Sequence, residues 1–347
     1  MSAKSVGRLI KNITGFMRAH LKSLNLSSLS CIFLLSTVVL TGSERARLTA
    51  PWPPPEGQIR VIIDADMNNE IDDQYALALA LGNPDRLKIE GVIAAHYGKN
   101  GEPDGIEKSF AETGRVLERA GLAGKFPVLR GINRLRDEYA IPTSDGVEFI
   151  IAQARSATPE KPLWLILLGP ATDGAAALLR DPSIADRIII FWHSRSSWPK
   201  QCGNFNAKND RLAAQLLFSL NCRLVLFDTG ENLTIPMEES ARRFGSLGPL
   251  GAYLQEIRLR SPRWQSPKKG VFDLGDIAAF LDVNCVEFER TPAPLVRDDF
   301  SYDFSTPQKE IVRIHKVNRE RSFVLLEESL HRIEKTAPPL IPAKNPQ

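Results

Sequence analysis

The sequence predicts an α/β fold in which helices cover both faces of an open, mostly parallel central sheet within a single domain. From Gln58 onward, short β-branched apolar runs alternate with helix-forming stretches, as in repeated strand–helix–strand units. The strand candidates are apolar throughout, which is typical of strands that are buried on both faces. No repeat and no change of composition divides residues 58–335, so we expect one domain.

The first strand is predicted at Arg60–Ile63 and the helix after it at Tyr75–Leu81, which Gly82-Asn83-Pro84 ends. Later segments repeat this alternation as far as the end of the domain. Strands are predicted at Ile89–Ala95, Pro127–Arg130, Leu163–Leu168, Ile188–Trp192, Arg223–Phe227 and Ile311–Val317, and helices at Ile106–Ala120, Asp210–Leu220 and Ser322–Ile333.

Residues 1–43 differ from the rest of the chain. They hold five basic and no acidic residues, and they end in the apolar run 32–40 followed by Thr41-Gly42-Ser43. This order is typical of a secretory signal, so we expect export to the periplasm or the medium. Initiation at Met17 would leave a leader of ordinary size. An uncleaved membrane anchor is the alternative, although the apolar run is short for a membrane span.

Two further segments flank the predicted domain. Residues 44–57 contain Pro51-Trp52-Pro53-Pro54-Pro55, which predicts a stiff, extended linker. Residues 336–347 are polar and rich in proline, and we expect a disordered tail there.

The charge balance and the cysteines exclude several classes of protein. The chain has 44 basic and 41 acidic residues, and without the predicted leader 39 basic residues remain. Such a chain lacks the basic surface that nucleic acid requires. Cys202, Cys222 and Cys285 form an odd, widely spaced set, which excludes a disulfide framework but leaves one bridge open. No pair has zinc-site spacing.

An acidic segment directly follows the first predicted strand. Five carboxylates lie within the ten residues Asp64–Asp73, and ligands bind at the carboxyl ends of strands in sheets of this kind. So many negative charges repel one another unless a cation joins them. Oxygen ligands favour Ca²⁺, or less readily Mg²⁺, over zinc. The alternative is a solvated loop in which Asp72 or Asp73 caps the next helix.

This segment resembles the opening motif of the inosine-uridine preferring nucleoside hydrolases, in which a strand precedes Asp-x-Asp and then an Asp-Asp pair. Three later segments resemble motifs of that family in the same order, and the similarity covers most of residues 58–285. They are Leu168–Asp173 (for Gly-Pro-Leu-Thr-Asn), Asn204-Phe205-Asn206 with Asn209-Asp210 (for Glu-Phe-Asn and Asp-Pro-Glu-Ala-Ala), and Asp273–Asp276 (for a late His-Asp).

The resemblance implies the nucleoside hydrolase fold and an enzyme that cleaves the N-glycosidic bond of ribonucleosides or a related riboside. It implies one Ca²⁺ held by Asp66, Asp73, the backbone carbonyl of Leu168 and Asp276. Asp66 would accept a proton from a metal-bound water, which would then attack the anomeric carbon. The transition state would resemble an oxocarbenium ion.

The same resemblance implies the contacts to the sugar. Asp72 would bind the ribose 2′-hydroxyl and Asn206 the 3′-hydroxyl, while Asn204 stands where the family has a ribose-binding Glu. The expected partner is therefore a small-molecule nucleoside or riboside. A membrane is expected only through an uncleaved N-terminus, and a homo-oligomer is left open.

The chain departs from the family pattern at two further points. Five residues separate Asp66 from Asp72, where the family motif has three. Gly275 stands where members of the family have the His that helps the leaving base. The acid is therefore unassigned, and His96 and His193 are candidates because both follow predicted strands.

Two other functions are compatible with parts of the sequence. A phosphatase of the haloacid dehalogenase type would use Asp64 as nucleophile and Asp66 as acid/base with Mg²⁺. That reading leaves Asp72, Asp73 and the Asn-Phe-Asn segment unexplained. A non-catalytic sugar- or nucleoside-binding protein would keep the metal-binding carboxylates without turnover, and the missing Glu and His leave this alternative open.

Overall fold

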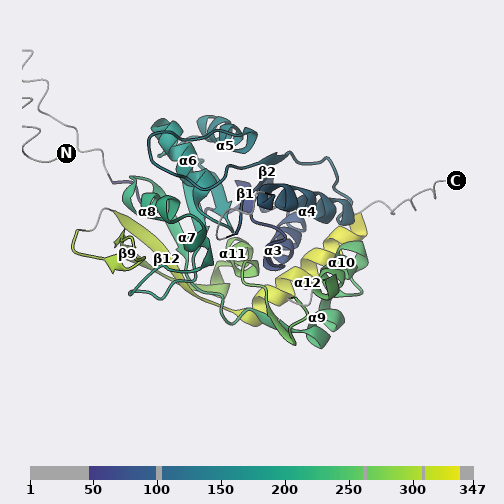
Figure 1. Cartoon of the computed structure of the whole chain (residues 1–347). Helices are drawn as coiled ribbons and strands as arrows, with labels where there is room; N and C mark the ends of the chain where they lie inside the picture. Colours follow the sequence, from purple (N-terminus) through teal and green to yellow (C-terminus); the bar gives the residue numbers. More distant parts are fainter. Residues whose placement is uncertain (1–46, 99–103, 261–263, 307–308, 337–347) are drawn as a thin grey trace, which may run out of the picture. The chain divides into compact units, whose positions relative to one another are not determined.

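The computed structural model describes residues 47–98, 104–260, 264–306 and 309–336 (Figure 1). The predicted leader 1–43 and residues 337–347 of the predicted tail lie outside the described residues, whereas Thr336 ends a helix. The described residues from Arg47 onward form one compact unit. Within the ranges that the structure describes, no helix has both the length and the apolar character that crossing a membrane requires.

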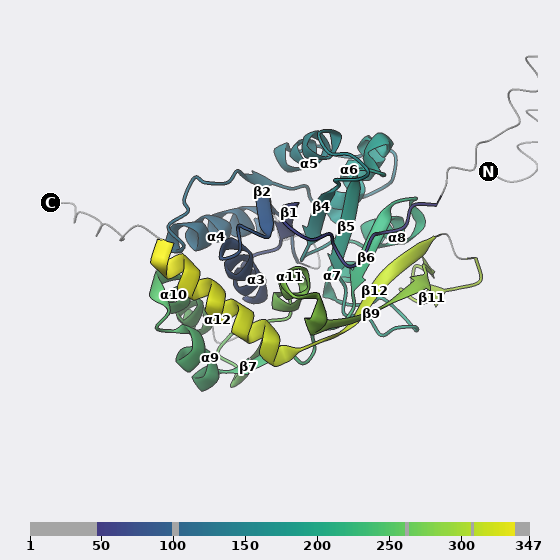
Figure 2. The same cartoon turned by 180° about the vertical axis from the view of Figure 1, so that it is seen from behind.

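The central sheet has eight strands in the order β3-β2-β1-β4-β5-β6-β12-β9. Neighbouring strands are parallel except for β9, which runs antiparallel to β12 at the edge (Figure 2). The predicted α/β class with a mostly parallel sheet is thus confirmed. The strands are β1 Ile59–Ala65, β2 Leu87–Ala94, β3 Val128–Arg130, β4 Leu163–Leu167, β5 Ile188–His193, β6 Arg223–Phe227, β9 Val286–Pro292 and β12 Glu310–Val317.

The strand order places a topological switch point between β1 and β4. From β1 the chain builds outward through β2 to β3, and it then returns to the other side of β1 with β4. Connections on the two sides of this point therefore leave the sheet in opposite directions, which opens a crevice at the strand ends. The acidic segment 64–73 begins at the end of β1, beside this crevice.

Helices cover both faces of the sheet (Figure 1). Along β1, Val61 and Ile63 pack into one hydrophobic cluster and Ile62 into the other, because successive side chains of a strand point to opposite faces. α5 (Asp145–Arg155), α6 (Thr172–Arg180) and α8 (Arg211–Ser219) cover the face of Ile62, whereas α3 (Asp72–Leu81), α4 (Gly105–Arg119), α10 (Gly248–Arg260), α11 (Leu274–Leu281) and α12 (Arg319–Thr336) cover the other.

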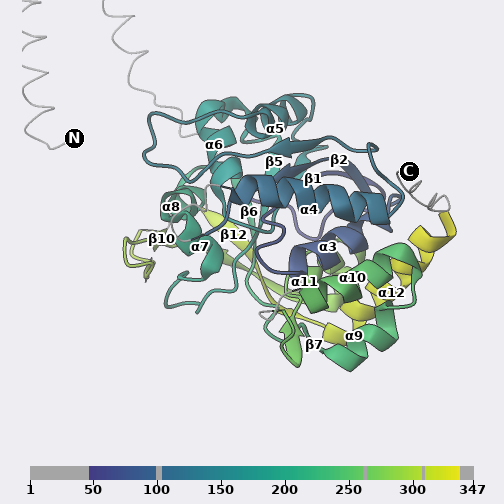
Figure 3. The same cartoon turned by 45° about the vertical axis from the view of Figure 1, so that its right-hand side comes forward.

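Helix α3 is buried along all ten of its residues. It contacts α11 and α12, and Figure 3 shows α11 beside it. This burial explains why the Ala- and Leu-rich segment lacks a polar face. It also fixes the acidic start of α3 against the start of α11, which positions the site described below.

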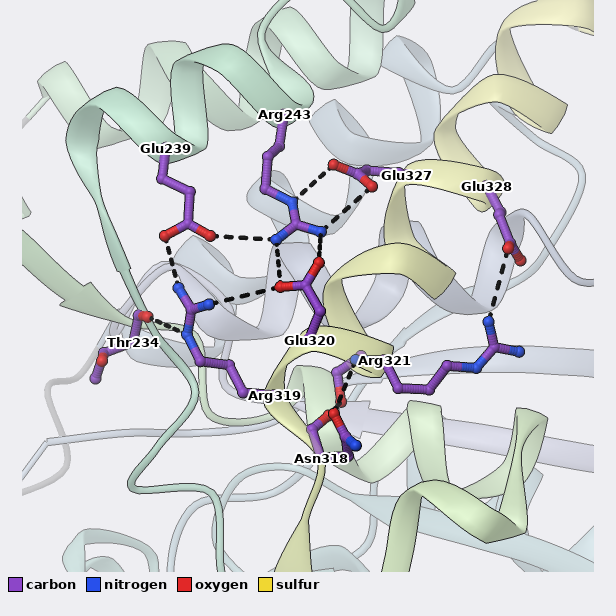
Figure 4. Close-up of polar contacts among 10 residues, drawn as sticks. Thr234, Glu239, Arg243, Asn318, Arg319, Glu320, Arg321, Glu327 and Glu328 are labelled. Carbon is purple, nitrogen blue, oxygen red and sulfur yellow. Dashed lines mark hydrogen bonds and ion pairs between the residues drawn. The ribbon is translucent and has the colours of Figure 1, made fainter.

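The C-terminal helix α12 is joined by charges to α9 (Met237–Phe244). The guanidinium of Arg243 forms ion pairs with Glu239, Glu320 and Glu327, at 3.2, 2.6 and 2.7 Å (Figure 4). Glu239 also pairs with Arg319 of α12 at 2.7 Å. The Arg243 side chain is only 8% exposed, so these charges are partly screened from water.

The segment predicted as a linker packs onto the sheet in its described part. Trp52 is 5% exposed, and its ring centroid lies 5.6 Å from those of Phe191 and Phe280 and 6.0 Å from that of Trp164. The expected extended linker is thus corrected here, because the apolar surface of the indole is buried against the core.

Candidate active site

A pocket of about 210 Å³ lies at the carboxyl ends of the central strands. The segments after β1, β4 and β5 contribute to it, together with residues 269–273, which join β8 (Lys268–Gly270) to α11. Four acidic residues line it: Asp66, Glu70, Asp72 and Asp273. The pocket thus coincides with the crevice that the strand order predicts.

The carboxylates of this pocket are buried and close together. Asp66, Asp72, Asp73 and Asp273 are all less than 9% exposed. Asp72, Asp73 and Asp273 each offer an oxygen, and these atoms lie within 4.8 Å of one another. The start of α3 therefore supplies two carboxylates, and the segment before α11 supplies the third.

Burial and mutual repulsion change the acidity of these groups. Burial raises the pKa of Asp66 well above its ordinary value, and the charge of Asp72 raises it further. Burial also raises the pKa values of Asp73 and Asp273. The charge of Asp66 raises the pKa of Asp73 further, and the charge of Asp72 raises that of Asp273. A cluster whose ionised form is disfavoured in this way is stabilised by a counter-charge.

Several oxygens of the cluster have no hydrogen-bond donor. Among the described residues, both carboxylate oxygens of Asp64 and one each of Asp73 and Asp276 are buried without a partner. Buried polar atoms nearly always have partners, so these vacant acceptors require an explanation. An oxygen-only donor set at these positions fits a hard divalent cation such as Ca²⁺.

The turn after β4 brings a backbone carbonyl to the same place. The side-chain Nδ2 of Asn206 donates to the backbone carbonyl of Leu168 at 2.7 Å and to that of His193 at 3.2 Å. A Cβ on Gly169 would lie 3.0 Å from Cβ of Asp66, so this close approach requires glycine. Leu168 and Asn206 both line the pocket.

Asn204 lines the pocket as well, but its amide is already used. Its Oδ1 accepts a hydrogen bond from the backbone N–H of Ala207 at 2.8 Å, and its Nδ2 donates to Oγ of Ser194 at 3.0 Å. Asn204 is therefore the N-cap of α7 (Phe205–Asn209). This cap places Asn206 in the first turn of α7, near Leu168.

His193, at the end of β5, lies between two carboxylates. Its Nδ1 is 2.7 Å from Oδ2 of Asp276 and 3.2 Å from Oδ1 of Asp273. Burial raises the pKa of Asp276 to about 6, against the opposing effect of the neighbouring His193. Asp276 is fully buried and bonded to His193, whereas Asp273 lines the pocket.

Asp273 is the site residue that the sequence analysis did not assign. It immediately precedes α11, one helical turn before Asp276. Residues three apart at a helix start share a face, so a carboxylate at 273 was a signal for a second ligand candidate. The resemblance assigns Asp276 as a metal ligand. Asp273 lies at the other end of the same turn, where one of its oxygens is within 4.8 Å of oxygens of Asp72 and Asp73.

The structure does not bring His96 to the pocket. His96 is fully buried, and its Nε2 lies 2.8 Å from Oγ1 of Thr172, which donates to Asp210 at 2.9 Å. The hydroxyl is thus the acceptor, and His96 is the donor. Burial lowers the pKa of His96 to about 4, with a smaller contribution from Arg134. A ring that stays neutral at pH 7 has no proton to give as a cationic acid. Of the two histidines, His193 therefore remains as the candidate for the acid.

Two cations complete the lining of the pocket. The ammonium of Lys269 forms an ion pair with Glu70. The guanidinium of Arg195 lies 3.6 Å from the ring centroid of Phe272, and both residues line the pocket. Positive and aromatic groups thus face the same space as the carboxylates.

The fold and this site together define an enzyme class with an oxygen-ligand metal site at the switch point of a parallel sheet. Residues 61–286 match the family model of the inosine-uridine preferring nucleoside hydrolases. The chain therefore belongs to this family of metal-dependent N-glycosidases, which act on ribonucleosides. A comparison with curated protein sequences gave no match.

Solved structures show the same fold. A plant nucleoside hydrolase is 20% identical, with a TM-score of 0.64, over 80% of this chain and 99% of the plant enzyme. A purine-preferring ribonucleoside hydrolase from Gardnerella vaginalis is 17% identical, with a TM-score of 0.60, over 80% and 99% of the two chains. The type III effector protein XopQ, complexed with adenosine diphosphate ribose, is 14% identical, with a TM-score of 0.61, over 81% and 95%.

Proposed function

We propose that this protein hydrolyses the N-glycosidic bond of a small-molecule riboside with the help of a bound Ca²⁺. The observation that carries the proposal is the buried group of Asp72, Asp73 and Asp273 at the switch point, whose carboxylate oxygens lie within 4.8 Å of one another. One oxygen of Asp73 has no hydrogen-bond partner among the described residues, as a cation ligand would require. The solved neighbours support a riboside substrate, because their names refer to nucleosides or adenosine diphosphate ribose.

The residues that would hold the ion are Asp66, Asp73, Asp273 and the carbonyl of Leu168. Asp273 takes the place of Asp276 in this set, because an oxygen of Asp273 lies within 4.8 Å of oxygens of Asp72 and Asp73. The Leu168 carbonyl keeps a second lone pair beside its bond from Asn206. When bound, Ca²⁺ would lower the pKa of a water and orient the sugar hydroxyls.

Side chains of the protein would activate the water, bind the sugar and stabilise the transition state. Asp66 accepts the proton of the attacking water, a role that suits a buried carboxylate whose pKa is raised. Asp72 and Asn206, which line the pocket, bind the ribose hydroxyls. The surrounding anionic oxygens stabilise the positive charge that develops on the sugar ring as the base departs.

His193 supplies the proton to the leaving base in this proposal. Its Nδ1 is bonded to Asp276 and Asp273, which leaves Nε2 for the substrate. The Asp276 carboxylate fixes the orientation of the ring, as carboxylates commonly do for catalytic histidines. We further propose that the enzyme acts after export, on the grounds of the predicted leader.

The test is to incubate the purified protein with inosine and uridine and to measure the reducing sugar that is released. Asp66→Asn should lower the rate by about 10²–10⁴-fold, the usual contribution of a general base. Asp298→Asn, at a side chain that is 84% exposed, is the matched control and should keep the wild-type rate.

The two alternatives predict other products. Release of inorganic phosphate from sugar phosphates, with an aspartyl-phosphate that Asp64→Asn abolishes, would establish the phosphatase instead. Tight nucleoside binding without release of sugar would establish a binding protein.

A further inference from the structure

Arg195 is the cation of the pocket whose charge is not balanced by a carboxylate. The other one, Lys269, is 8% exposed and paired with Glu70. Among the described residues, no carboxylate forms an ion pair with Arg195, whose side chain instead lies over the ring of Phe272. A guanidinium stays charged at any physiological pH, so this side of the pocket presents a net positive group.

The backbone holds Arg195 in an uncommon conformation. Its φ angle is 51°, in the left-handed region that non-glycine residues enter at a cost of about 1 kcal/mol or more. The residue lies two positions after the end of β5, where the chain enters the pocket wall. Strain of this kind concentrates at functional sites, which indicates that the placement of this side chain has a use.

The ring of Phe272 determines which part of the guanidinium is available. The guanidinium carbon lies 3.6 Å from the ring centroid, so one of its faces is covered. The N–H donors of a guanidinium lie in its plane and point outward in a fork that matches carboxylate and phosphate oxygens. Stacking on one face therefore leaves the in-plane N–H donors of Arg195 available to a ligand.

The chain segment that holds Arg195 presents no carboxylate of its own to the pocket. Ser194, Asn204, Phe205 and Asn206 line the pocket from the same chain segment as Arg195, and none carries a negative charge. The amide of Asn204 is already used in capping α7 and binding Ser194. The carboxylates come instead from the segment after β1 and from the start of α11.

We propose that the riboside carries an anionic group, either a phosphate ester on the sugar or a carboxylate on the base, and that Arg195 binds it. This inference rests on the proposed function and names the substrate class. Charge-assisted hydrogen bonds to a guanidinium increase affinity by about 10–100-fold. A neutral nucleoside would leave the N–H donors of the Arg195 guanidinium without an anionic partner.

The experiment compares two matched pairs of substrates. Inosine is paired with inosine 5′-phosphate, and nicotinamide riboside with nicotinate riboside, so that each pair differs by one anionic group. The value of kcat/KM is measured by release of reducing sugar for the wild type, Arg195→Gln, Arg195→Lys and Arg242→Gln. Arg242 is an exposed residue of α9, so its variant controls for the loss of one positive charge.

In at least one pair the wild type should prefer the anionic member by about 10–100-fold. Arg195→Gln should abolish that preference, Arg195→Lys should retain part of it, and Arg242→Gln should keep it. The pair that responds locates the anion on the sugar or on the base. A wild type without preference in either pair, or a preference that survives in Arg195→Gln, would overturn the inference.

These outcomes differ from a failure of the proposed function, in which none of the four compounds would be cleaved. Calorimetric binding of the same pairs then decides the inference by itself. Tighter binding of an anionic member that depends on Arg195 supports it, and equal binding within both pairs contradicts it.

Discussion

His193, Asp273 and Asp276 form a connected and buried group. Asp276 is fully buried and holds Nδ1 of His193, while Asp273 reaches both this histidine and the pocket. Both carboxylates contact Nδ1 of His193, but only Asp273 also lines the pocket, so Asp273 is the stronger candidate for a metal ligand. This division supports an acid at His193 and a ligand at Asp273.

The first residue-scale prediction concerns His193→Ala. Without the proton donor, hydrolysis of inosine should slow by about 10²–10⁴-fold, the usual contribution of general acid catalysis. Hydrolysis of p-nitrophenyl riboside should change little, because its leaving group departs without a proton. His96→Gln is the matched control, since His96 does not line the pocket. Equal slowing of both substrates by His193→Ala would show that the histidine has another role.

The second residue-scale prediction concerns His96 and acid stability. The pKa of His96 falls from 6.5 to about 4 because the ring is buried, and the Nδ1 that would take the second proton has no partner in the described structure. Between pH 6.5 and 4 the unfolded chain therefore binds a proton that the folded chain does not, and stability is lost as the pH falls.

His96→Gln removes this titration. Between pH 7 and pH 4, the free energy of unfolding of the wild type should fall by roughly 3 kcal/mol more than that of the variant. Urea unfolding at several pH values gives, for each protein, the slope of the free energy of unfolding against pH. If the slopes are the same, His96 is not held neutral by the fold.

At the scale of elements, β4 and β5 show what local pattern can predict. Both are apolar along almost their whole length and buried on both faces, so their sequence alone predicts a strand of a parallel sheet. β9 was not predicted, because most of its residues are exposed and it pairs only at the edge of the sheet. Pairing of that kind depends on β12, which is distant in sequence.

The site was predictable to a similar extent. Asp66, Asp72, Leu168, Asn204 and Asn206 all line the pocket, because strand ends and short turns constrain where they lie. The choice between Asp273 and Asp276, and between His96 and His193, depends on how the start of α11 and the residues after β2 lie relative to the pocket. The residue types mark the candidates but do not say which side chain faces the cavity.

The prediction at this scale concerns the contact between α9 and α12 in Figure 4. Arg243→Met keeps the apolar stem but leaves Glu327 without its cation, while Glu239 and Glu320 keep only Arg319. We expect a loss of about 1–3 kcal/mol in the free energy of unfolding, since a partly buried charge network is broken. Urea denaturation measures it.

Arg321→Met is the matched control. Arg321 lies on α12, and its side chain is 40% exposed with partners at Asp282 and Glu328. Exposed ion pairs contribute about 1 kcal/mol or less, so this variant should change stability less than Arg243→Met does. The reverse order would mean that the network in Figure 4 is screened by solvent.

At the scale of the whole molecule, the fold concentrates negative charge at one point of a nearly neutral chain. The switch point brings carboxylates from residues 64–73 together with Asp273 and Asp276, although more than 190 residues separate them in the sequence. A cluster that is this buried is stabilised by a bound cation. The central claim is therefore that activity requires one divalent ion at this point.

The most direct test measures the release of ribose from inosine before and after removal of metal. Protein purified without chelator should contain about one equivalent of Ca²⁺, as a single oxygen-ligand site requires. Treatment with EGTA should abolish the release, and added Ca²⁺ should restore it. Protein shown by elemental analysis to be free of metal, yet releasing ribose at the full rate, would contradict the account.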